Sequence, residues 1–401
     1  MLNIIKRSAA GLLATQLPSG YIGNYKESAQ LTEWDIWGRK YTLLGLLAYY
    51  DLTGDKTALK GSCRLADNLL SQVGPGKVNI VKTGNYLGMP SSSILEPMVY
   101  LYRRTGDKKY LDFAKYIVEQ WETKEGPKLI SSALAGIAVS ERFPHPDVWW
   151  SYDNGQKAYE MMSCYEGLLE LYRITGEPSY LKAVEMAVKN IIATEINIAG
   201  SGTAFECFYN GARYQTDPTY HTMETCVTMT WMKLCFNLLR LTENPESEVQ
   251  LNKGNRIKID QSSKYPATPE VNINIMPQKP ENFTISFRIP QWSRNTVLTI
   301  NGEPVEGIVP GTYKKITRTW NCTDQLILKL DLTGRLITQN GYQAIMRGPV
   351  VLARDTRFGD GFIYESAEVK DNGGNIDLIP SSKKPADVFY CVFTRQTVHR
   401  L

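Results

Sequence analysis

The chain has 401 residues, more than one compact core usually serves, so its length predicts at least two domains. Its 43% hydrophobic and 21% charged residues are typical of a globular protein, and no apolar run is long enough for a membrane span. The net charge of +4 is too small for this length to indicate a nucleic-acid partner.

The first twenty residues combine a cationic pair with a short apolar run, as a signal peptide does. Five apolar residues also fall on one face of a helix, namely Ile4, Ile5, Ala9, Leu12 and Leu13. We favour an amphipathic helix of the fold, which Gly20 ends. The location stays open: periplasmic or secreted if a signal precedes this chain, and cytoplasmic otherwise.

A repeated pattern of helix end, turn and new helix start runs through the first 246 residues. It reads AYYDLTGDKTAL, YLYRRTGDKKYL and ELYRITGEPSYL, with NLLRLTENPE as a weaker fourth copy. The turn residues are Gly54, Gly106, Gly176 and Asn244. Gly or Asn fits the left-handed position after a helix, and the following acid favours the positive end of the next helix. Each copy therefore predicts a helical hairpin.

Hairpins of this size predict an α/α toroid over residues 1–246, an incomplete form of the six-hairpin barrel. Its long loops are rich in Trp, Tyr, Asn and Gly: TEWDIWGRK, VKTGNYLGMPSSS, PDVWWSYDNGQK and GSGTAFECFYNGARY. A single aromatic residue there is more often simple packing. Four such loops on one rim favour a sugar-like ligand, because aromatic faces stack on C–H faces while amides and acids bond hydroxyls.

Past Glu246 the hydrophobic period changes from 3.6 to 2, as in FTISFRI and LILKLDL. This alternation predicts an antiparallel β-sandwich over residues 247–357, followed by a loop-rich tail with possible strands over 358–401. The expected fold class is therefore multi-domain α+β.

The stretch YHTMETCVTM places three possible metal ligands, His221, Glu224 and Cys226, within six positions. Zinc accepts carboxylate and thiolate ligands and prefers four of them. The alternative is a helix start with an acid near its positive end and a buried cysteine. The seven cysteines are scattered and include no C-x-x-C pair, which argues against a disulfide framework.

The segments WDIWGRKYTLLGLL, NGQKAYEMMSCYEGLLELYRITG, METC, FRIPQW and IMRGPVVLARD occur in the order seen in one known family. The chain resembles the glycoside hydrolase family 127 group, the β-L-arabinofuranosidase-like proteins, from about Ala10 to about Arg354. The resemblance implies an α/α barrel with β-sandwich domains and retaining cleavage of an arabinofuranoside or related sugar from a plant-type glycan.

The resemblance also implies a zinc ion held by one Glu and three Cys, of which Glu224 and Cys226 match two. The other two form an adjacent Cys-Cys pair that contains the nucleophile, and this chain has no such pair. A Glu upstream of the METC segment is the implied acid/base. We choose Glu206, although a different alignment places Thr203 there, because a hydroxyl is too weak an acid. We expect Glu206 to face the metal pair without a Lys or Arg partner.

The positions of certain residues within the predicted hairpins place them on the cavity rim, where we expect them to bind substrate. They are Trp34, Asp35, Trp37, Tyr86, Trp150, Tyr152, Gln156, Lys157, Tyr159 and His221. Lys157 suits an acidic sugar substituent, though a single Lys is more often a surface charge. The expected partner is an oligosaccharide or polysaccharide, and the oligomeric state stays open.

Two other functions fit the same residues. One is a non-catalytic carbohydrate-binding relative, which needs no nucleophile. The other is a metal-free lyase or inverting hydrolase in which Asp35 faces Glu206. The missing Cys-Cys segment and an interrupted fourth hairpin also predict that Glu246 and Ser247 are not adjacent in the natural protein.

Overall fold

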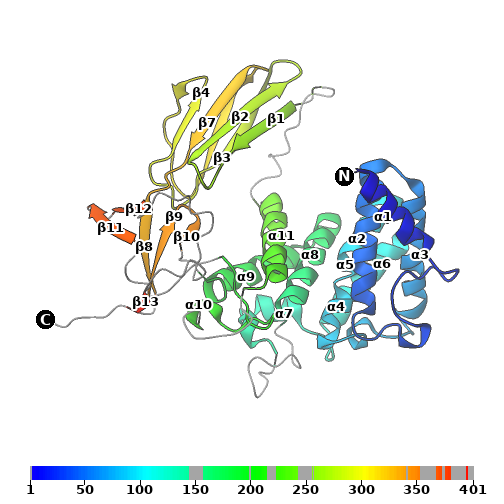
Figure 1. The fold of residues 1–401 in the computed structure, drawn as a ribbon. Coiled ribbons are helices and arrows are strands. Elements are labelled where there is room, and N and C mark those ends of the chain that lie inside the picture. Colours follow the sequence, from blue (N-terminus) through cyan, green and yellow to red (C-terminus); the bar gives the residue numbers. More distant parts are fainter. Residues whose placement is uncertain are drawn as a thin grey trace. The chain divides into compact units, whose positions relative to one another are not determined.

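The computed structural model forms two compact units, Met1–Leu241 and Thr242–Leu401 (Figure 1). It describes residues 2–143, 157–197, 200–214, 223–242, 255, 257–339, 342–352, 367–372, 375–380 and 394–395. The expected junction of Glu246 and Ser247 lies outside these ranges. Within them, no helix has both the length and the apolar character that crossing a membrane requires.

The first unit is built from helices joined by short turns and longer loops. The α-helices are α1 (Leu2–Ala14), α2 (Asp35–Thr53), α3 (Lys56–Gln72), α4 (Met89–Ser92), α5 (Leu95–Thr105), α6 (Lys108–Trp121), α7 (Leu129–Leu134), α8 (Ala158–Thr175), α9 (Pro178–Thr194), α10 (Gly211–Tyr214) and α11 (Thr225–Thr242). Short 3-10 helices are η1 (Glu27–Ala29), η2 (Ile80–Lys82), η3 (Tyr86–Gly88) and η4 (Val139–Glu141).

Three of the predicted hairpins are confirmed. Helices α2, α5 and α8 each end at a glycine with a positive φ, which are Gly54 (73°), Gly106 (71°) and Gly176 (68°). An acidic residue caps the start of each following helix: Asp55 for α3, Asp107 for α6 and Glu177 for α9. Each of these side chains accepts a hydrogen bond from a backbone N–H in the first turn of its helix. The fourth turn residue, Asn244, lies outside the described ranges.

The hairpins pack in series around one apolar core. Helix α2 pairs with α3, α5 with α6 and α8 with α9, while α5 lies between α2 and α8. Gly167 makes the α5–α8 contact close, because a Cβ there would lie 2.9 Å from Glu96 N. The core includes Leu43, Leu101 and Leu168, all fully buried.

Helix α1 confirms the helical interpretation of the N-terminal segment but not the burial of its whole apolar face. Ala9 is buried, and Leu12 and Leu13 pack against the core. Ile4 is 61% exposed, contrary to its expected place on the buried face. Burial along the predicted face begins at Ile5, which is half-buried. An apolar period shows which face of a helix is apolar, but not how much of its length a neighbour covers.

The second unit consists of antiparallel sheets. Its strands are β1 (Ile257–Ser263), β2 (Glu270–Pro277), β3 (Glu281–Arg288), β4 (Val297–Ile300), β5 (Glu303–Pro304), β6 (Tyr313–Trp320), β7 (Asp324–Lys329), β8 (Gly334–Gln339), β9 (Tyr342–Arg347), β10 (Val350–Leu352), β11 (Ala367–Asn372), β12 (Asn375–Pro380) and β13 (Thr394–Arg395).

A five-stranded sheet in the order β1-β2-β7-β4-β5 shares one apolar core with the pair β3-β6. Trp320 is fully buried in this core and donates its indole N–H to Phe283 O at 2.9 Å. Strand β2 buries alternate residues such as Val271 and Ile275, as the period of 2 predicts.

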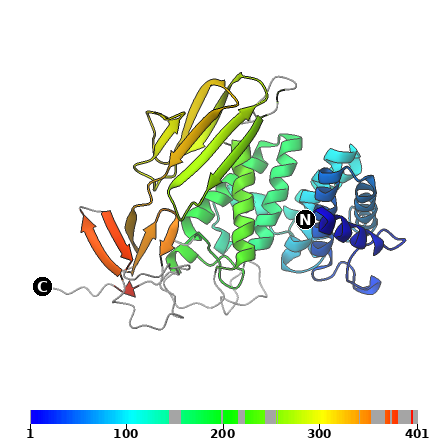
Figure 2. The same cartoon turned by 45° about the horizontal axis from the view of Figure 1, so that its top comes forward.

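The third sheet contains strands from both sides of residue 357, where the β-sandwich is expected to end. Strands β8 to β10 pair with each other and with β11, β12 and β13 of the tail, in orange and red in Figures 1 and 2. The shared core of the first two sheets therefore ends near Leu330, and the three described strands of the tail, β11, β12 and β13, belong to another sheet. Alternation identifies a strand but not its partner, which is why the sequence did not separate these sheets.

Candidate functional site

Glu206 lies in a strained turn. Ala204 and Cys207 exchange two backbone hydrogen bonds of 3.1 and 2.9 Å, which leaves Phe205 and Glu206 at the corner. Both corner residues have positive φ, 50° and 63°. Asn and Gly are the usual residues of such a turn, and a side chain there costs roughly 1–2 kcal/mol per residue. Backbone strain of this kind is concentrated at functional sites, so the turn makes Glu206 a candidate functional residue.

The turn is fixed to the start of α8 through backbone and side chain. Ala158 N donates to Glu206 O at 2.9 Å, and Lys157 Nζ lies 2.5 Å from Glu206 Oε2. The Lys157 side chain is 2% exposed and that of Glu206 34%. Burial opposes the charge on Lys157, but the hydrogen bond to Glu206 and the negative charges of Glu160, Tyr86 and Glu206 together outweigh burial and raise the lysine pKa. The expectation that Glu206 lacks a cationic partner is therefore wrong, and Lys157 is not a surface charge.

Glu206 and Thr203 differ in how far they are exposed to solvent. Thr203 is 1% exposed, and its backbone oxygen accepts a hydrogen bond from Met223 N at 3.1 Å. Its hydroxyl has no hydrogen-bond partner among the described residues. Thr203 is thus an interior residue that ties the turn to the start of α11, while Glu206 reaches the surface.

A row of aromatic rings extends from the Lys157–Glu206 pair along the start of α2. Lys157 Nζ lies 5.1 Å from the centre of the Tyr86 ring. The following ring-to-ring distances are Tyr86–Trp34 6.2 Å, Trp34–Trp37 5.9 Å, Trp37–Tyr159 5.0 Å and Trp37–Tyr41 5.4 Å. The structure therefore brings together five of the predicted rim residues, Trp34, Trp37, Tyr86, Lys157 and Tyr159. The sequence analysis missed Tyr41, whose hydroxyl is hydrogen-bonded to that of Tyr159.

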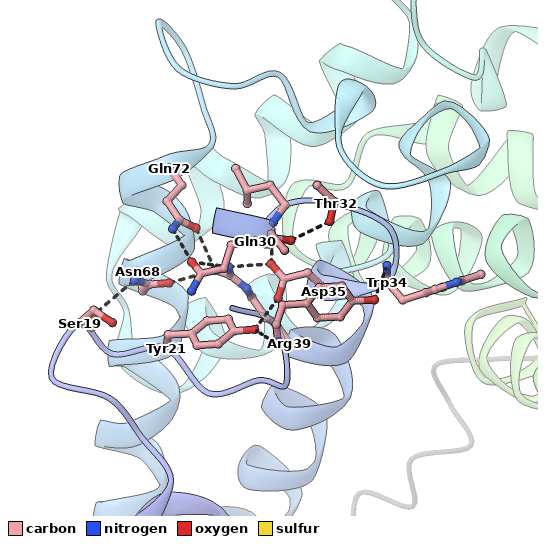
Figure 3. Close-up of polar contacts among 12 residues, drawn as sticks. Ser19, Tyr21, Gln30, Thr32, Trp34, Asp35, Arg39, Asn68 and Gln72 are labelled. Carbon is pink, nitrogen blue, oxygen red and sulfur yellow. Dashed lines mark hydrogen bonds and ion pairs between the residues drawn. The ribbon is translucent and has the colours of Figure 1, made fainter. Parts of the chain in front are cut away.

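Asp35 does not lie on a rim. Its carboxylate is buried, with 1% of the side chain exposed, and it accepts hydrogen bonds from three donors (Figure 3). These are Tyr21 Oη at 2.8 Å, Leu31 N at 2.8 Å and Arg39 Nη2 at 2.7 Å. The expected substrate contact of Asp35, and its pairing with Glu206 in an inverting site, are corrected accordingly. Asp35 instead fixes the loop that carries Trp34.

The two predicted metal ligands flank the start of α11. Cys226 is exposed, and burial together with the charge of Glu224 raises the pKa of its thiol. The charge of Glu206 acts on the same thiol, so these three predicted residues share one neighbourhood. Carboxylate and thiolate are suitable zinc donors, but zinc needs four. The described residues contain no group of three His, Cys, Asp or Glu side chains placed to hold a metal.

Four predicted substrate-binding residues, Trp150, Tyr152, Gln156 and His221, lie outside the described ranges. The structure leaves their placement as a prediction.

Charged residues inside the helices form a second group that the sequence analysis missed. Lys233 Nζ of α11 lies 2.9 Å from Glu96 of α5 and 2.9 Å from Glu166 of α8, and both glutamates are buried. Glu160 of α8 and Lys40 of α2 are also buried. The available signal was the glutamates in the otherwise apolar run AYEMMSCYEGLLELY.

Comparison with known families identifies the chain. The family model described as the GH127 catalytic domain of β-L-arabinofuranosidase matches residues 1–249. The chain belongs to the GH127 family. The model of the GH127 β-L-arabinofuranosidase middle domain matches residues 243–332 of this GH127 chain, ending where the core of the first two sheets ends.

A curated relative of the GH127 chain is the non-reducing end β-L-arabinofuranosidase of Bifidobacterium longum subsp. longum. It is 26% identical over 157 residues, which are 33% of this chain and 24% of the relative. The chain thus matches about a quarter of that relative's length.

Solved structures share the fold of the GH127 chain. A GH127 β-L-arabinofuranosidase from Geobacillus stearothermophilus T6 has a TM-score of 0.70 at 18% identity, covering 92% of this chain and 76% of its own. A second GH127 β-arabinofuranosidase has a TM-score of 0.67 at 18% identity, with 98% and 81% covered. At these identities the likeness concerns the fold.

Proposed function

We propose that this GH127 chain acts as a glycoside hydrolase that releases arabinofuranose or a related sugar from a plant-type glycan. The observation that carries the proposal is the Glu206–Lys157 pair at one end of the aromatic row. Family membership and the curated relative support the sugar class. In this proposal the hairpins form part of an incomplete α/α toroid, and the sheets with a shared core form a β-sandwich.

The aromatic row suits the binding of a sugar. Ring faces stack on the C–H face of a furanose, and the hydroxyl groups of Tyr41, Tyr86 and Tyr159 bond its hydroxyls. Glu206 stands at the end of the row and is partly exposed, so it can meet a glycosidic oxygen. We assign it the general acid/base role: it protonates the leaving oxygen and then takes a proton from the attacking water.

Retention at the anomeric carbon needs a nucleophile, which the family resemblance places in a Cys-Cys pair. No two of the seven cysteines in this chain are adjacent. Cys226 is a proposed metal ligand with a raised thiol pKa, so we do not assign it as the nucleophile. The identity of the nucleophile in the proposed retaining reaction is therefore taken from the family resemblance, and no residue of this chain is assigned to it.

We propose zinc as the metal, with Glu224 and Cys226 as two of its ligands. Bound zinc would keep coordinated thiols deprotonated. Metal analysis of purified protein tests this assignment. Wild type and Cys322→Ala, which changes an exposed cysteine of the second unit, should hold equal zinc, and Cys226→Ala should hold much less. Equal zinc in all three proteins would refute the role of Cys226.

The decisive experiment compares two substrates. Glu206→Gln should slow the hydrolysis of an arabinofuranosyl disaccharide by about 10²-fold or more, because its leaving group needs a proton. An aryl β-L-arabinofuranoside, with a better leaving group, should suffer less. Glu119→Gln, an exposed residue of α6, is the control and should match wild type. Full activity of the Glu206→Gln variant on the disaccharide would contradict the acid role.

A non-catalytic carbohydrate-binding function is the second candidate, favoured by the intact aromatic row and the lack of a Cys-Cys pair. Calorimetric titration with the same disaccharide distinguishes the two. Binding without hydrolysis, lost on Trp37→Ala, would favour the binding function.

A further inference from the structure

Glu195 is a buried residue at the end of α9, and its carboxyl group binds the loop that carries Glu206. It is 0% exposed. Its Oε2 atom accepts hydrogen bonds from Tyr209 N at 2.9 Å, Asn210 N at 2.9 Å and Gly211 N at 3.2 Å. Burial raises the pKa of Glu195, while these hydrogen bonds favour its ionised form. Three backbone donors on one carboxylate oxygen fix the segment 209–211 to the end of α9.

Both ends of this loop pack against the backbone of Glu195. A Cβ added to Gly202 would lie 2.1 Å from Glu195 O, and one added to Gly211 would lie 2.8 Å from the same atom. Such close contacts between backbone segments leave no room for a side chain at either position. Residues 202–211 therefore form a loop whose two ends meet at Glu195, as in an Ω-loop, and Glu206 lies between them.

The first part of the loop is also attached to α11. Ser201 Oγ and Thr228 Oγ1 are hydrogen-bonded at 2.7 Å, and Met223 N donates to Thr203 O at 3.1 Å. The loop thus joins the end of α9 to the start of α11. Glu206 lies between these two attachments, so its place depends on both.

The preceding hairpin uses the same kind of anchor. Glu122 is the residue after the last turn of α6, as Glu195 is for α9. Its carboxylate accepts hydrogen bonds from Ile130 N at 2.9 Å and Ser131 N at 3.2 Å, at the start of α7. The two glutamates therefore have equivalent positions in successive hairpins. They differ in the loop that they hold, since the loop of Glu195 carries Glu206.

We propose that Glu195 is a positioning residue for the acid/base Glu206. By holding residues 209–211, it keeps the turn of Glu206 where the carboxyl group reaches the glycosidic oxygen. The inference rests on the proposed function, in which Glu206 is the acid/base. Glu195 itself touches no reacting atom and acts only through the loop backbone. The position matters because a misplacement of about 1 Å can slow catalysis by about 10²-fold.

The first test measures the anchor without turnover, by hydrogen exchange of the full chain. In Glu195→Gln an amide group replaces one carboxylate oxygen, and its N–H donors face the backbone N–H groups. Exchange in residues 202–211 should become about tenfold faster or more, because charge-assisted hydrogen bonds are lost. Glu122→Gln is the matched control and should speed exchange in residues 129–131 but not in 202–211. Unchanged exchange in residues 202–211 of Glu195→Gln would overturn the proposal.

The second test separates positioning of the acid from a general loss of structure. Glu195→Gln should lower kcat on the arabinofuranosyl disaccharide by about tenfold or more and the aryl substrate less, because only the disaccharide needs the acid. KM should change little, since the aromatic row lies on α2, η3 and α8. Glu195→Asp, which keeps the carboxyl group on a shorter side chain, should show the same pattern with a smaller loss. It also serves as the test variant if Glu195→Gln does not fold. Equal losses of kcat on both substrates would contradict the positioning role.

The third test is a double-mutant cycle. Adding Glu195→Gln to Glu206→Gln should slow the disaccharide reaction little further, because the place of the loop no longer matters once its acid is gone. Losses that multiply would show that Glu195 acts independently of Glu206 and would refute the inference. If wild type hydrolyses neither substrate, the proposed function fails and the catalytic part of the inference fails with it. A hydrolytic wild type with unchanged kinetics in Glu195→Gln and Glu195→Asp would overturn the inference alone.

Discussion

Arg39 Nη2 donates to Asp35 Oδ2 at 2.7 Å, and neither side chain is accessible, with 0% and 1% exposed. The pair closes a network in which Tyr21 and Leu31 complete the hydrogen bonding of the carboxylate (Figure 3). Gln30, Asn68 and Gln72 accept further bonds from the guanidinium group. The loop before α2 is thereby fixed where its aromatic residues begin.

Asp35→Ala should therefore destabilise the helical unit by about 3–5 kcal/mol, because it leaves Arg39 buried without its carboxylate. Urea unfolding followed by the far-UV signal of helices measures the loss. Asp51→Ala is the control, since Asp51 pairs with Arg104 but is 47% exposed, and it should cost about 1 kcal/mol or less. Equal effects of both substitutions would contradict the structural role of Asp35.

Gly167 permits the close contact of α8 with α5. A Cβ at this position would lie 2.9 Å from Glu96 N and 2.9 Å from Leu95 Cβ, so Gly167→Ala should cost about 1–3 kcal/mol through overpacking. Gly45 in α2 has open space around the same position, and Gly45→Ala should stabilise by about 0.5–1 kcal/mol. Thermal unfolding of the two variants should therefore shift in opposite directions, and a shared direction would refute the contact.

The sequence predicted those features that depend on local chemistry. The Thr-Gly-acid turns fix a left-handed residue and a helix cap within a few positions, so the hairpins at Gly54, Gly106 and Gly176 were predictable. The aromatic residues were predictable as a group because the hairpin repeat places the loops that carry them on the same rim. Partners were not, since Lys157 and Glu206 are 49 positions apart and nothing local joins them.

The wrong assignments have a common physical reason. Asp35 begins α2 directly after a loop that is rich in functional residue types, but its carboxylate is buried and paired with Arg39 at position i+4. A sequence motif does not distinguish a rim carboxylate from one that is buried and paired. In the second unit, alternation identifies β2 as a strand but does not show that β7 shares its sheet and that β8 and β9 belong to a different one.

Lys233 pairs with two buried carboxyl groups, Glu96 and Glu166. The unfolding free energy that is lost when Lys233 is replaced should therefore depend on pH. Burial opposes the ammonium form, but the charges of Glu96 and Glu166 outweigh it and raise the lysine pKa, so its contribution is constant below about pH 10. Lys233→Met removes one of the charges that hold the pKa of Glu166 down. The variant should lose more unfolding free energy at pH 8, where the carboxyl groups tend to ionise, than at pH 5. Lys182→Met, at an exposed pair, is the control.

The two interior glutamates of α8 should make the helical unit less stable as the pH rises. Burial raises the pKa of Glu160 and of Glu166 from 4.5 to about 7, so the folded state binds these protons more tightly than the unfolded state. Their contribution is unchanged below about pH 4.5, declines between about 4.5 and 7, and is constant above that range. Glu160→Gln removes one titrating group and should flatten this decline.

Urea unfolding of the helices at pH 5, 6, 7 and 8 measures the slope. Each buried glutamate should account for at most about 3 kcal/mol of the change, since one pKa unit corresponds to about 1.4 kcal/mol. Glu160→Gln and Glu166→Gln should each have a smaller slope than wild type, and Glu119→Gln, on the exposed side of α6, should keep the full slope. A wild-type stability that rises from pH 5 to 7, with all three variants parallel to it, would show that these glutamates are ionised throughout in the folded protein.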